Sequence, residues 1–427
     1  MKIKIHRGLE QIGGCITEIS TETSRVFIDM GQNLPGNGKK TTPEQDKKMV
    51  ENLFINHPKK YQAVVYTHAH EDHVGLFGYV PDNVPQYIGE GSKEILMAKY
   101  ELIMEGHKLN LESALTSSVT NPNNCKQEMC EELQQTIEED KKKIEKLNAF
   151  HTWPRPKPHT RPSSFSIGDI NITPFFNCHS IYDSYMLLID DGKERIWHTG
   201  DYREHGYMGK GLIPTLKRYA RNIDVLITEG TMLGRNDECI HESEVSRKMA
   251  CVMDAFKYVV VLASATDIER LASIKEAAQK AQKQWYICSG YMNRTMHIFT
   301  RREAKYSKGL FEFHPKYVSQ DDPKIMTMKK KGFILIAGVN QLETVENICS
   351  YIDNSQVVFI YSTWDGYYKD PAQISANPKY EEFRKAFSNI VDIHTSGHAD
   401  KATIHKIIKV ITPKKVICIH KEAGTSL

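Results

Sequence analysis

One short segment concentrates side chains that bind metal ions. Thr67-His68-Ala69-His70-Glu71-Asp72-His73 places three imidazoles and two carboxylates within six residues. Imidazole nitrogens and carboxylate oxygens are typical ligands of zinc and of neighbouring divalent metals. Crowding such groups together for packing alone would be costly, because each must leave water. The segment therefore predicts a metal site in which alternate residues of a tight loop bind one ion and the Asp-His pair turns toward a second.

Four further candidates lie far along the chain, each at or just after the end of a run that is typical of a strand. They are His179, Asp201, His398 and His420. A single residue of this kind is more often a polar side chain with an ordinary hydrogen-bond partner. Because α/β folds place their chemistry at strand ends, the repeated placement predicts that these residues join the histidine-rich segment.

Alternating or continuous β-branched residues predict the strands that position these side chains. In the first part of the chain the predicted strands are 3–5, 15–19, 25–30, 62–67, 170–176, 185–189 and 195–198. A second alternation of strands and helices runs from about 222 to 385 and predicts a doubly wound lobe. The last strands, 390–393 and 416–419, return to the histidine cluster, so the first domain is predicted to be discontinuous.

Residues 92–108 and 125–149 have the pattern of helices, and we expect them to form an arm. A proline-rich stretch, 151–161, follows and is predicted to lack regular structure, because prolines remove backbone donors and fix backbone angles. This stretch is either a surface linker or a loop that faces the substrate. The arm and the loop are also candidates for homo-oligomer assembly or substrate entry.

The order Asp29, then the histidine-rich segment, then His179 and Asp201 resembles the metallo-β-lactamase superfamily. Within that superfamily the chain resembles the β-CASP nucleases. Three marks carry this second resemblance: Glu229 in Ile227-Thr228-Glu229-Gly230-Thr231, His398 in a Ser-Gly-His-Ala element, and His420, 22 residues later. The segment THAHEDHVG at 67–75 looks particularly like the ribonuclease J branch.

The resemblance implies an α/β fold, a metallo-β-lactamase αββα sandwich with an inserted doubly wound β-CASP lobe. It divides the chain into a metallo-β-lactamase domain at 1–210 that includes the arm and loop at 92–165, an inserted β-CASP domain at 211–385, and a return segment at 386–427. Only seven residues follow His420, so the resemblance does not extend to the separate C-terminal domain of ribonuclease J.

Carried over position by position, the resemblance also implies a pair of divalent ions, with zinc as the expected metal and manganese as the alternative. The first ion would be bound by His68, His70 and His179, the second by Asp72, His73 and His420, and Asp201 would bridge both. Asp72 counts among the catalytic residues as well. Asp29 would orient a ligand or the water between the ions.

Two such ions would share a hydroxide that attacks a phosphodiester. His398 would give a proton to the leaving oxygen, and Glu229 would hold its imidazole in the donating form. Because a histidine at the position of His420 is typical of RNA-processing members, the resemblance implies single-stranded RNA as the substrate. Ser396 and Arg270 are the candidates for contacts with its phosphates, and Arg270 is otherwise a solvated helix residue.

Two alternative functions stay open at this point. The same pair of ions can hydrolyse small esters, lactones or phosphodiesters, and some relatives have become non-catalytic RNA-binding scaffolds. The inserted lobe and the pair of Glu229 and His398 count against the first alternative. The complete set of ligands counts against the second.

The composition is that of a globular protein and does not identify a substrate. The 427 residues are 40% hydrophobic, which suffices for a large core in two or three lobes. A formal net charge of +3 neither favours nor excludes a polyanionic partner. No stretch is apolar enough for an export signal or a membrane span, and nine scattered cysteines do not form a disulfide framework. We therefore expect no membrane association and a cytoplasmic location.

Overall fold

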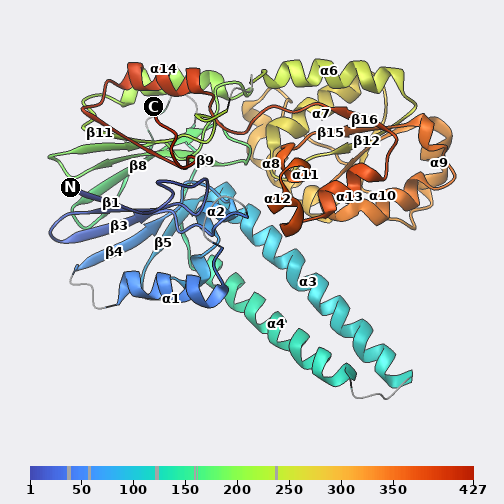
Figure 1. Cartoon of the computed structure of the whole chain (residues 1–427), viewed down its shortest axis with the longest axis horizontal. Coiled ribbons are helices and arrows are strands. Elements are labelled where there is room, and N and C mark those ends of the chain that lie inside the picture. Colours follow the sequence, from blue (N-terminus) through green and yellow to red (C-terminus); the bar gives the residue numbers. More distant parts are fainter. Residues whose placement is uncertain (36–39, 56–58, 121–124, 158–159, 161, 236–238) are drawn as a thin grey trace.

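The computed structural model describes residues 1–35, 40–55, 59–120, 125–157, 160, 162–235 and 239–427. Its strands form three sheets, two of which are stacked while the third lies beside them with its own helices (Figure 1). The helices are α1 (Pro43–Phe54), α2 (Glu71–Val74), α3 (Glu90–Thr120), α4 (Cys125–Asn148), α5 (Leu212–Tyr219), α6 (Glu242–Ala255), α7 (Ile268–Lys280), α8 (Gly290–Glu303), α9 (Lys324–Lys331), α10 (Leu342–Cys349), α11 (Gly366–Lys369), α12 (Pro371–Ala376), α13 (Lys379–Lys385) and α14 (Lys401–Ile411).

The first sheet contains the N-terminal strands. In spatial order they are β1 (Lys2–Arg7), β2 (Ile16–Ser20), β3 (Ser24–Ile28), β4 (Tyr61–Val65), β5 (Gln86–Gly89) and β6 (His151–Trp153). The first three strands are antiparallel, and β3 to β6 are parallel. Because β3 and β4 are parallel, the loops that follow them, which carry Asp29 and the histidine-rich segment, leave the sheet at the same edge.

The second sheet joins the middle of the chain to its end. In spatial order its strands are β17 (Lys415–Ile419), β11 (Val225–Glu229), β10 (Arg195–His198), β9 (Ser184–Asp190), β8 (Ile170–Asn177) and β7 (Phe165–Ile167). Strands β10, β11 and β17 are parallel, and β8 runs the same way because both it and β10 are antiparallel to β9. The ends of these four strands therefore reach one edge, where the predicted residues His179, Asp201, Glu229 and His420 lie.

Side chains alternate between the two faces of each sheet, and this alternation builds the layers. Val26 and Val65 of the first sheet pack against Leu187 and Ile227 of the second in the space between the sheets. The opposite face of the first sheet packs on α1 and α3. The opposite face of the second packs on α5 and α14, for example through Trp197. The predicted αββα sandwich is confirmed.

The third sheet is entirely parallel. Its strands, in spatial order, are β13 (Trp285–Ile287), β14 (Phe333–Ala337), β12 (Tyr258–Leu262), β15 (Val357–Tyr361) and β16 (Asn389–Asp392). Val259 and Val261 of β12 pack with α6, α7 and α8, whereas Val260 and Leu262 pack with α9, α10 and α13. Both faces are therefore covered, which explains the unbroken apolar sequence of β12.

The last two strands of the chain belong to different sheets, contrary to the sequence analysis. Strand β16 pairs with β15 in the third sheet, and only β17 returns to the second sheet, where it pairs with β11. The strand predicted at 390–393 therefore does not return to the sandwich, although the sequence analysis expected it to do so. Sequence spacing could not show this difference, because both strands are short and apolar and their partners lie elsewhere in the chain. The division into 1–210, 211–385 and 386–427 otherwise stays a prediction.

The predicted arm is a pair of helices, α3 and α4, that pack together and project from the body (Figure 1). A hydrogen bond of 2.7 Å between His107 Nδ1 and Asp140 Oδ2 links them. The proline-rich stretch begins with regular structure, since residues 151–153 form β6 beside β5, and Pro154 follows this strand. Residues 158, 159 and 161 of this stretch lie outside the described residues.

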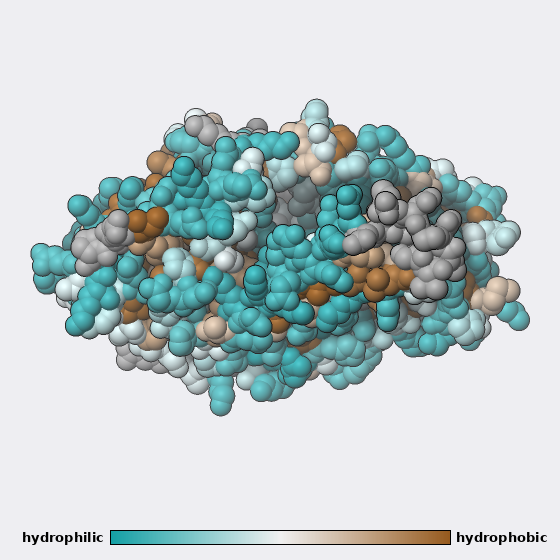
Figure 2. Space-filling model, turned by 90° about the horizontal axis from the view of Figure 1, so that it is seen from below, coloured by the Kyte–Doolittle hydropathy of each residue, from teal (hydrophilic) through white to brown (hydrophobic). Residues whose placement is uncertain are grey.

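The surface carries no single large apolar region on the face seen in Figure 2, where hydrophilic side chains predominate and hydrophobic ones lie in small groups. None of the helices in the described part of the chain has the length and apolar character needed to cross a membrane.

We expect the third sheet to be sensitive to a cavity at its centre. Leu335 of β14 is fully buried, so Leu335→Ala should lower the apparent free energy of unfolding by about 2–5 kcal/mol. Met326 in α9 of the same lobe is 76% exposed, so Met326→Ala should change it by no more than about 0.5 kcal/mol. Urea denaturation followed by circular dichroism would measure both. Equal effects of the two substitutions would contradict the packing described above.

Candidate metal centre

The histidine-rich segment leaves β4 and folds back in one short turn of helix. His68 and His70 lie in the connection after β4, and α2 begins directly after His70. The helical turn brings His73 back beside His68, so that their ring centroids are 4.1 Å apart. His68, Asp72 and His73 are buried.

The loop after β3 holds this turn in place through its backbone. Met30 N donates to His73 O at 2.7 Å, and Gln32 N donates to Glu71 O at 2.9 Å. Gly31 lies between them, and a Cβ atom there would be 1.8 Å from the carbonyl oxygen of Asp72. Only glycine leaves room for this close approach. Contacts between protein atoms alone thus hold the two loops together.

Three imidazoles form a first cluster. His70 Nδ1 lies 3.2 Å from His68 Nε2 and 3.1 Å from His179 Nε2. His179 follows β8 and is buried, whereas His70 is partly exposed. The ring nitrogens of all three lie within 4.8 Å of one another, which is close enough for one metal ion to bind them together.

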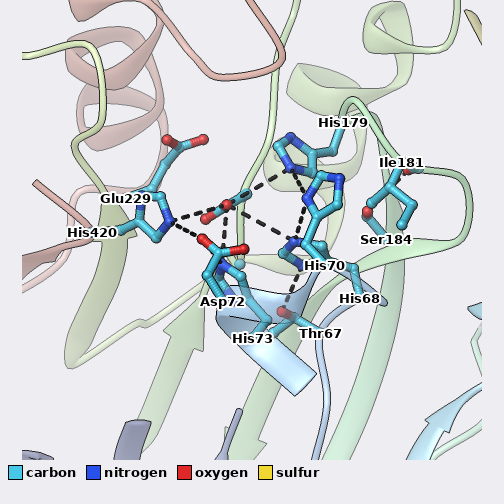
Figure 3. Close-up of polar contacts among 12 residues, drawn as sticks. Thr67, His68, His70, Asp72, His73, His179, Ile181, Ser184, Glu229 and His420 are labelled. Carbon is cyan, nitrogen blue, oxygen red and sulfur yellow. Dashed lines mark hydrogen bonds and ion pairs between the residues drawn. The ribbon is translucent and has the colours of Figure 1, made fainter. Parts of the chain in front are cut away.

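A second cluster lies beside the first. Asp72 Oδ2 is 3.0 Å from His420 Nε2 and 3.7 Å from His73 Nε2. Asp201 Oδ2 lies between the two clusters, at 3.1 Å from His73 Nε2 and 3.7 Å from His179 Nε2. Figure 3 shows the side chains of both clusters directed toward one shared space. The structure thus brings together all the residues that the sequence analysis predicted as ligands.

Two atoms in the centre lack the partners that buried polar atoms normally have. Asp201 Oδ2 and His73 Nε2 are both buried, and neither has a hydrogen-bond partner among the described residues. Although they are 3.1 Å apart, they are not oriented for a hydrogen bond with each other. Buried groups left in this state are costly, and a cation between them would remove the cost. The residues therefore fit divalent metal ions.

Asp29 orients two of the histidines. Its Oδ2 accepts from His73 Nδ1 at 2.7 Å, and its carboxylate also accepts from the amide and the hydroxyl of Thr67. The Thr67 hydroxyl in turn lies 2.9 Å from His68 Nδ1. Since the Thr67 proton is given to Asp29, this hydroxyl accepts from His68, and both rings turn their Nε2 atoms toward the centre. Asp29 has a φ of 63°, a conformation that Asp tolerates better than most residues.

The rings from later in the chain are oriented in the same way. His179 Nδ1 donates to Gly397 O at 2.7 Å, and His420 Nδ1 lies 2.7 Å from Thr231 Oγ1. Partners of this kind fix which nitrogen of a histidine carries the proton and leave the other free for a metal ion. Of the residues above, Thr67 and Thr231 were missed as partners in the sequence analysis.

Burial lowers the pKa of the imidazoles in the first cluster. It holds the pKa of His68 and His179 well below the ordinary value, and neighbouring imidazoles add to the effect. The pKa of His70 falls to about 4, again chiefly through burial, although Asp72 acts in the opposite direction. A neutral imidazole has a free lone pair, so at neutral pH these rings are in the form that binds a cation.

The second cluster is rich in negative charge. Burial raises the pKa of Asp72 and Asp201, but the neighbouring His73 and His420 lower it more strongly, so that both carboxylates are ionised at neutral pH. Burial lowers the pKa of His73, and Asp201 and Asp29 raise it well above the ordinary value. The ionised carboxylates give this cluster the negative charge that attracts a divalent cation.

His398 lies at the rim of the centre. Its Nδ1 is 2.8 Å from Glu229 Oε2 and 3.7 Å from Asp201 Oδ2. Glu229 is buried and also accepts from Tyr202 N at 2.8 Å and from the Thr231 hydroxyl at 2.8 Å. Burial lowers the pKa of His398, but Glu229 and then Asp201 raise it above the ordinary value. The pair that the sequence analysis predicted is therefore in contact, with His398 in a form that can donate a proton.

The two predicted phosphate contacts differ in their surroundings. Ser396 is partly exposed in the turn before His398, and its Oγ accepts from His398 N at 3.1 Å. Arg270 is 1% exposed and donates to Glu242, Ser362 and Thr395 inside the third-sheet lobe. The predicted contact of Arg270 with substrate is therefore wrong, and so is the alternative of a solvated helix residue. The start of α7 is packed at the junction of the lobes, which the sequence of the helix does not reveal.

The residues around the centre that the sequence analysis missed have partners far away in the chain. Thr231 is separated from His398 by 167 positions and from His420 by 189. Arg203, two positions after Asp201, is fully buried and pairs with Glu242 and Asp267. The only sequence feature that pointed to Thr231 and Arg203 was that each lies two positions after a predicted residue, Glu229 or Asp201.

No protein-family model matches the chain. Ribonuclease J of Helicobacter pylori (strain B128) is 22% identical to it over 442 aligned positions, which cover 99% of this chain and 56% of that protein. Ribonuclease J of Sinorhizobium meliloti is 20% identical over 411 positions, which cover 93% of this chain and 64% of that protein. The chain thus spans little more than half the length of these relatives.

The fold also resembles a solved structure. The crystal structure of a protein of unknown function from Enterococcus faecalis V583 matches it with a TM-score of 0.67 and 16% identity, covering 99% of this chain and 96% of that one. At this identity the likeness concerns the fold alone. Together with the layers described above, it agrees with the α/β fold of metallo-β-lactamase type that the sequence predicted.

We expect Asp201 to be essential for metal binding. Removing a partner of a ligand typically costs about 10–100-fold in metal affinity, so Asp201→Ala, which removes the shared carboxylate itself, should cost more than about 100-fold. Glu71→Ala is the matched control, because Glu71 belongs to the same segment but pairs with Lys99. Metal titration with a competing chelator, followed by elemental analysis, would measure both. Full metal binding by a folded Asp201→Ala protein would remove the assignment.

Proposed function

We propose that the chain is a metal-dependent phosphodiesterase of the β-CASP nuclease type that cleaves single-stranded RNA. The observation that carries this proposal is that six candidate ligands gather around Asp201, with the pair of His398 and Glu229 beside them. Four of the six lie in residues 68–73, and His179 and His420 come from distant parts of the chain. The similarity to proteins named ribonuclease J supports RNA as the substrate. The third-sheet lobe corresponds in this proposal to the inserted β-CASP domain.

In the proposal the first cluster would hold one ion, Asp72, His73 and His420 would hold a second, and Asp201 would serve both. The predominance of imidazole donors favours zinc, with manganese as the alternative. When bound, such ions would lower the pKa of water and neutralise negative charge on a phosphate. Buried free thiols such as Cys178 and Cys288 support a reducing, cytoplasmic location.

The chain's own residues prepare the site for this chemistry. Asp29 and Thr231 fix the rings of His73 and His420, so little reorganisation is needed at the moment of reaction. Glu229 occupies Nδ1 of His398, which leaves Nε2 as the atom that can give a proton to the leaving oxygen. Ser396, which is partly exposed two residues before His398, remains our candidate for a phosphate contact.

Cleavage of labelled RNA would test the proposed substrate. Metal-loaded protein should cut single-stranded RNA that carries a label at its 5′ or 3′ end, and the two sets of products would show the cleavage mode. Single-stranded DNA and a small phosphodiester are the comparison substrates, and Asp72→Ala is the inactive control. Turnover of the small phosphodiester alone would indicate a small-molecule hydrolase. Absence of any cleavage by metal-loaded protein would contradict a nuclease.

We expect His398 to act in turnover and not in metal binding. His398→Ala should retain its metal and lose about 10²–10⁴-fold in the rate of RNA cleavage, the range typical of a lost general acid. His405 is exposed on α14, so His405→Ala should cleave at the wild-type rate. Single-turnover rates and elemental analysis of the same samples separate the two effects. A metal-replete His398→Ala protein with undiminished activity would exclude His398 as the proton donor.

A further inference from the structure

The turn that carries His398 is held by its backbone carbonyl groups. Thr395 O accepts from Arg270 Nη2 at 3.2 Å, and Ser396 O accepts from Arg203 Nη1 at 3.3 Å and from His205 Nε2 at 2.7 Å. The next carbonyl, of Gly397, accepts from His179. Consecutive carbonyl groups just before His398 are thus each fixed by a side chain from another part of the chain.

Glu242 joins the two arginines that make these contacts. Its Oε1 lies 2.9 Å from Arg270 Nη2 and 3.2 Å from Arg203 Nη1, and its Oε2 lies 3.2 Å from Arg270 Nε. All three residues are at most 1% exposed. Arg203 also pairs with Asp267 at 3.1 Å and with Glu269 at 3.0 Å. The result is a buried network of charged groups directly behind the turn.

The network lies where the sandwich meets the third-sheet lobe. Glu242 is the first residue of α6, and Arg270 lies in the first turn of α7, both of which cover the third sheet. Arg203 follows β10 of the sandwich, shortly after Asp201. Arg270 also donates to Ser362 O at 2.9 Å, just beyond the end of β15. The lobe therefore reaches the turn of His398 through Arg270.

Stability alone is a poor explanation of such a network. Taking several charged groups out of water is costly, and well-packed apolar residues of similar size often stabilise a fold equally well or better. The charged groups instead fix the orientation of the groups they contact, because an arginine has several donors in a rigid planar arrangement. Here those donors hold the acceptor atoms of one particular turn.

We propose that Arg270 and Glu242 are positioning residues, which fix the place of His398 through the carbonyl groups of Thr395 and Ser396. The third-sheet lobe thereby sets the geometry of the proton donor. This inference rests on the proposed function for the role of His398, but the contact itself does not depend on that function. Removing Arg270 should leave the metal ligands in place and release the turn.

Arg270→Met, which keeps the length of the side chain and removes its donors, tests the inference in the full-length, metal-loaded protein. Arg25→Met is the matched control, since Arg25 is also buried, at 2% exposed, but lies in β3 and contacts Leu53 O and Glu18. Three quantities are measured for each: bound metal, amide hydrogen exchange of residues 394–400, and kcat and KM on single-stranded RNA. Arg270→Lys, which keeps one charged donor, should be intermediate, and Glu242→Gln serves as a second variant if Arg270→Met does not fold.

We expect Arg270→Met to keep its metal, to exchange faster than wild type at residues 394–400, and to lose about 100-fold in kcat with little change in KM, as for a misplaced catalytic group. Arg25→Met should show none of these changes. Unchanged exchange in the 394–400 segment, or equal losses in both variants, would overturn the inference. Faster exchange in a protein that cleaves no RNA, even as wild type, would support the positioning contact and count against the proposed function instead.

Discussion

Oδ2 of Asp201 lies within 3.9 Å of ring nitrogens from His68, His73, His179 and His420, yet it forms no hydrogen bond with any described residue. A buried carboxylate oxygen in this position would be strongly unfavourable without a counter-charge. Imidazole nitrogens and carboxylate oxygens around one point are the donor types that divalent cations prefer. A cation between these groups would remove this cost, and the rest of the sandwich can be understood as the means of bringing the groups to one point.

A second layer of contacts converts this crowding into a defined arrangement. Asp29, the Thr67 hydroxyl, the Thr231 hydroxyl and the carbonyl of Gly397 each take up one ring nitrogen of a histidine. Each of these contacts turns the other ring nitrogen of its histidine toward the centre. The same partners link neighbouring functions, since the Thr231 hydroxyl contacts both Glu229 and His420. In the proposed function, metal binding and proton transfer would therefore share one network of polar groups.

The junction between the sandwich and the third-sheet lobe is the other place where buried charge is concentrated. Arg203 and Arg270 face Glu242, Asp267 and Glu269 there, and the turn that carries His398 lies against them. Helices α6 and α7 of the lobe contribute contacts to the chain segment that carries His398, the proposed proton donor. A movement of the lobe relative to the sandwich would therefore displace His398.

The sequence by itself determined the type of chemistry and most of the local structure. The density of ligand side chains after β4, the placement of His179, Asp201 and His420 after apolar strands, and the resemblance to β-CASP nucleases were enough to predict the layers and the candidate ligands. These features are local, because strand patterns and ligand types can be read within a few residues. Only the tertiary structure decided the partners of buried polar groups. Arg270 proved to be part of the lobe junction, β16 joined the third sheet, and Thr231 linked His420 to Glu229. In each case the deciding contact joins residues that are far apart in the sequence. Strand pairing and helix packing bring these residues together, and a local sequence pattern does not record such contacts.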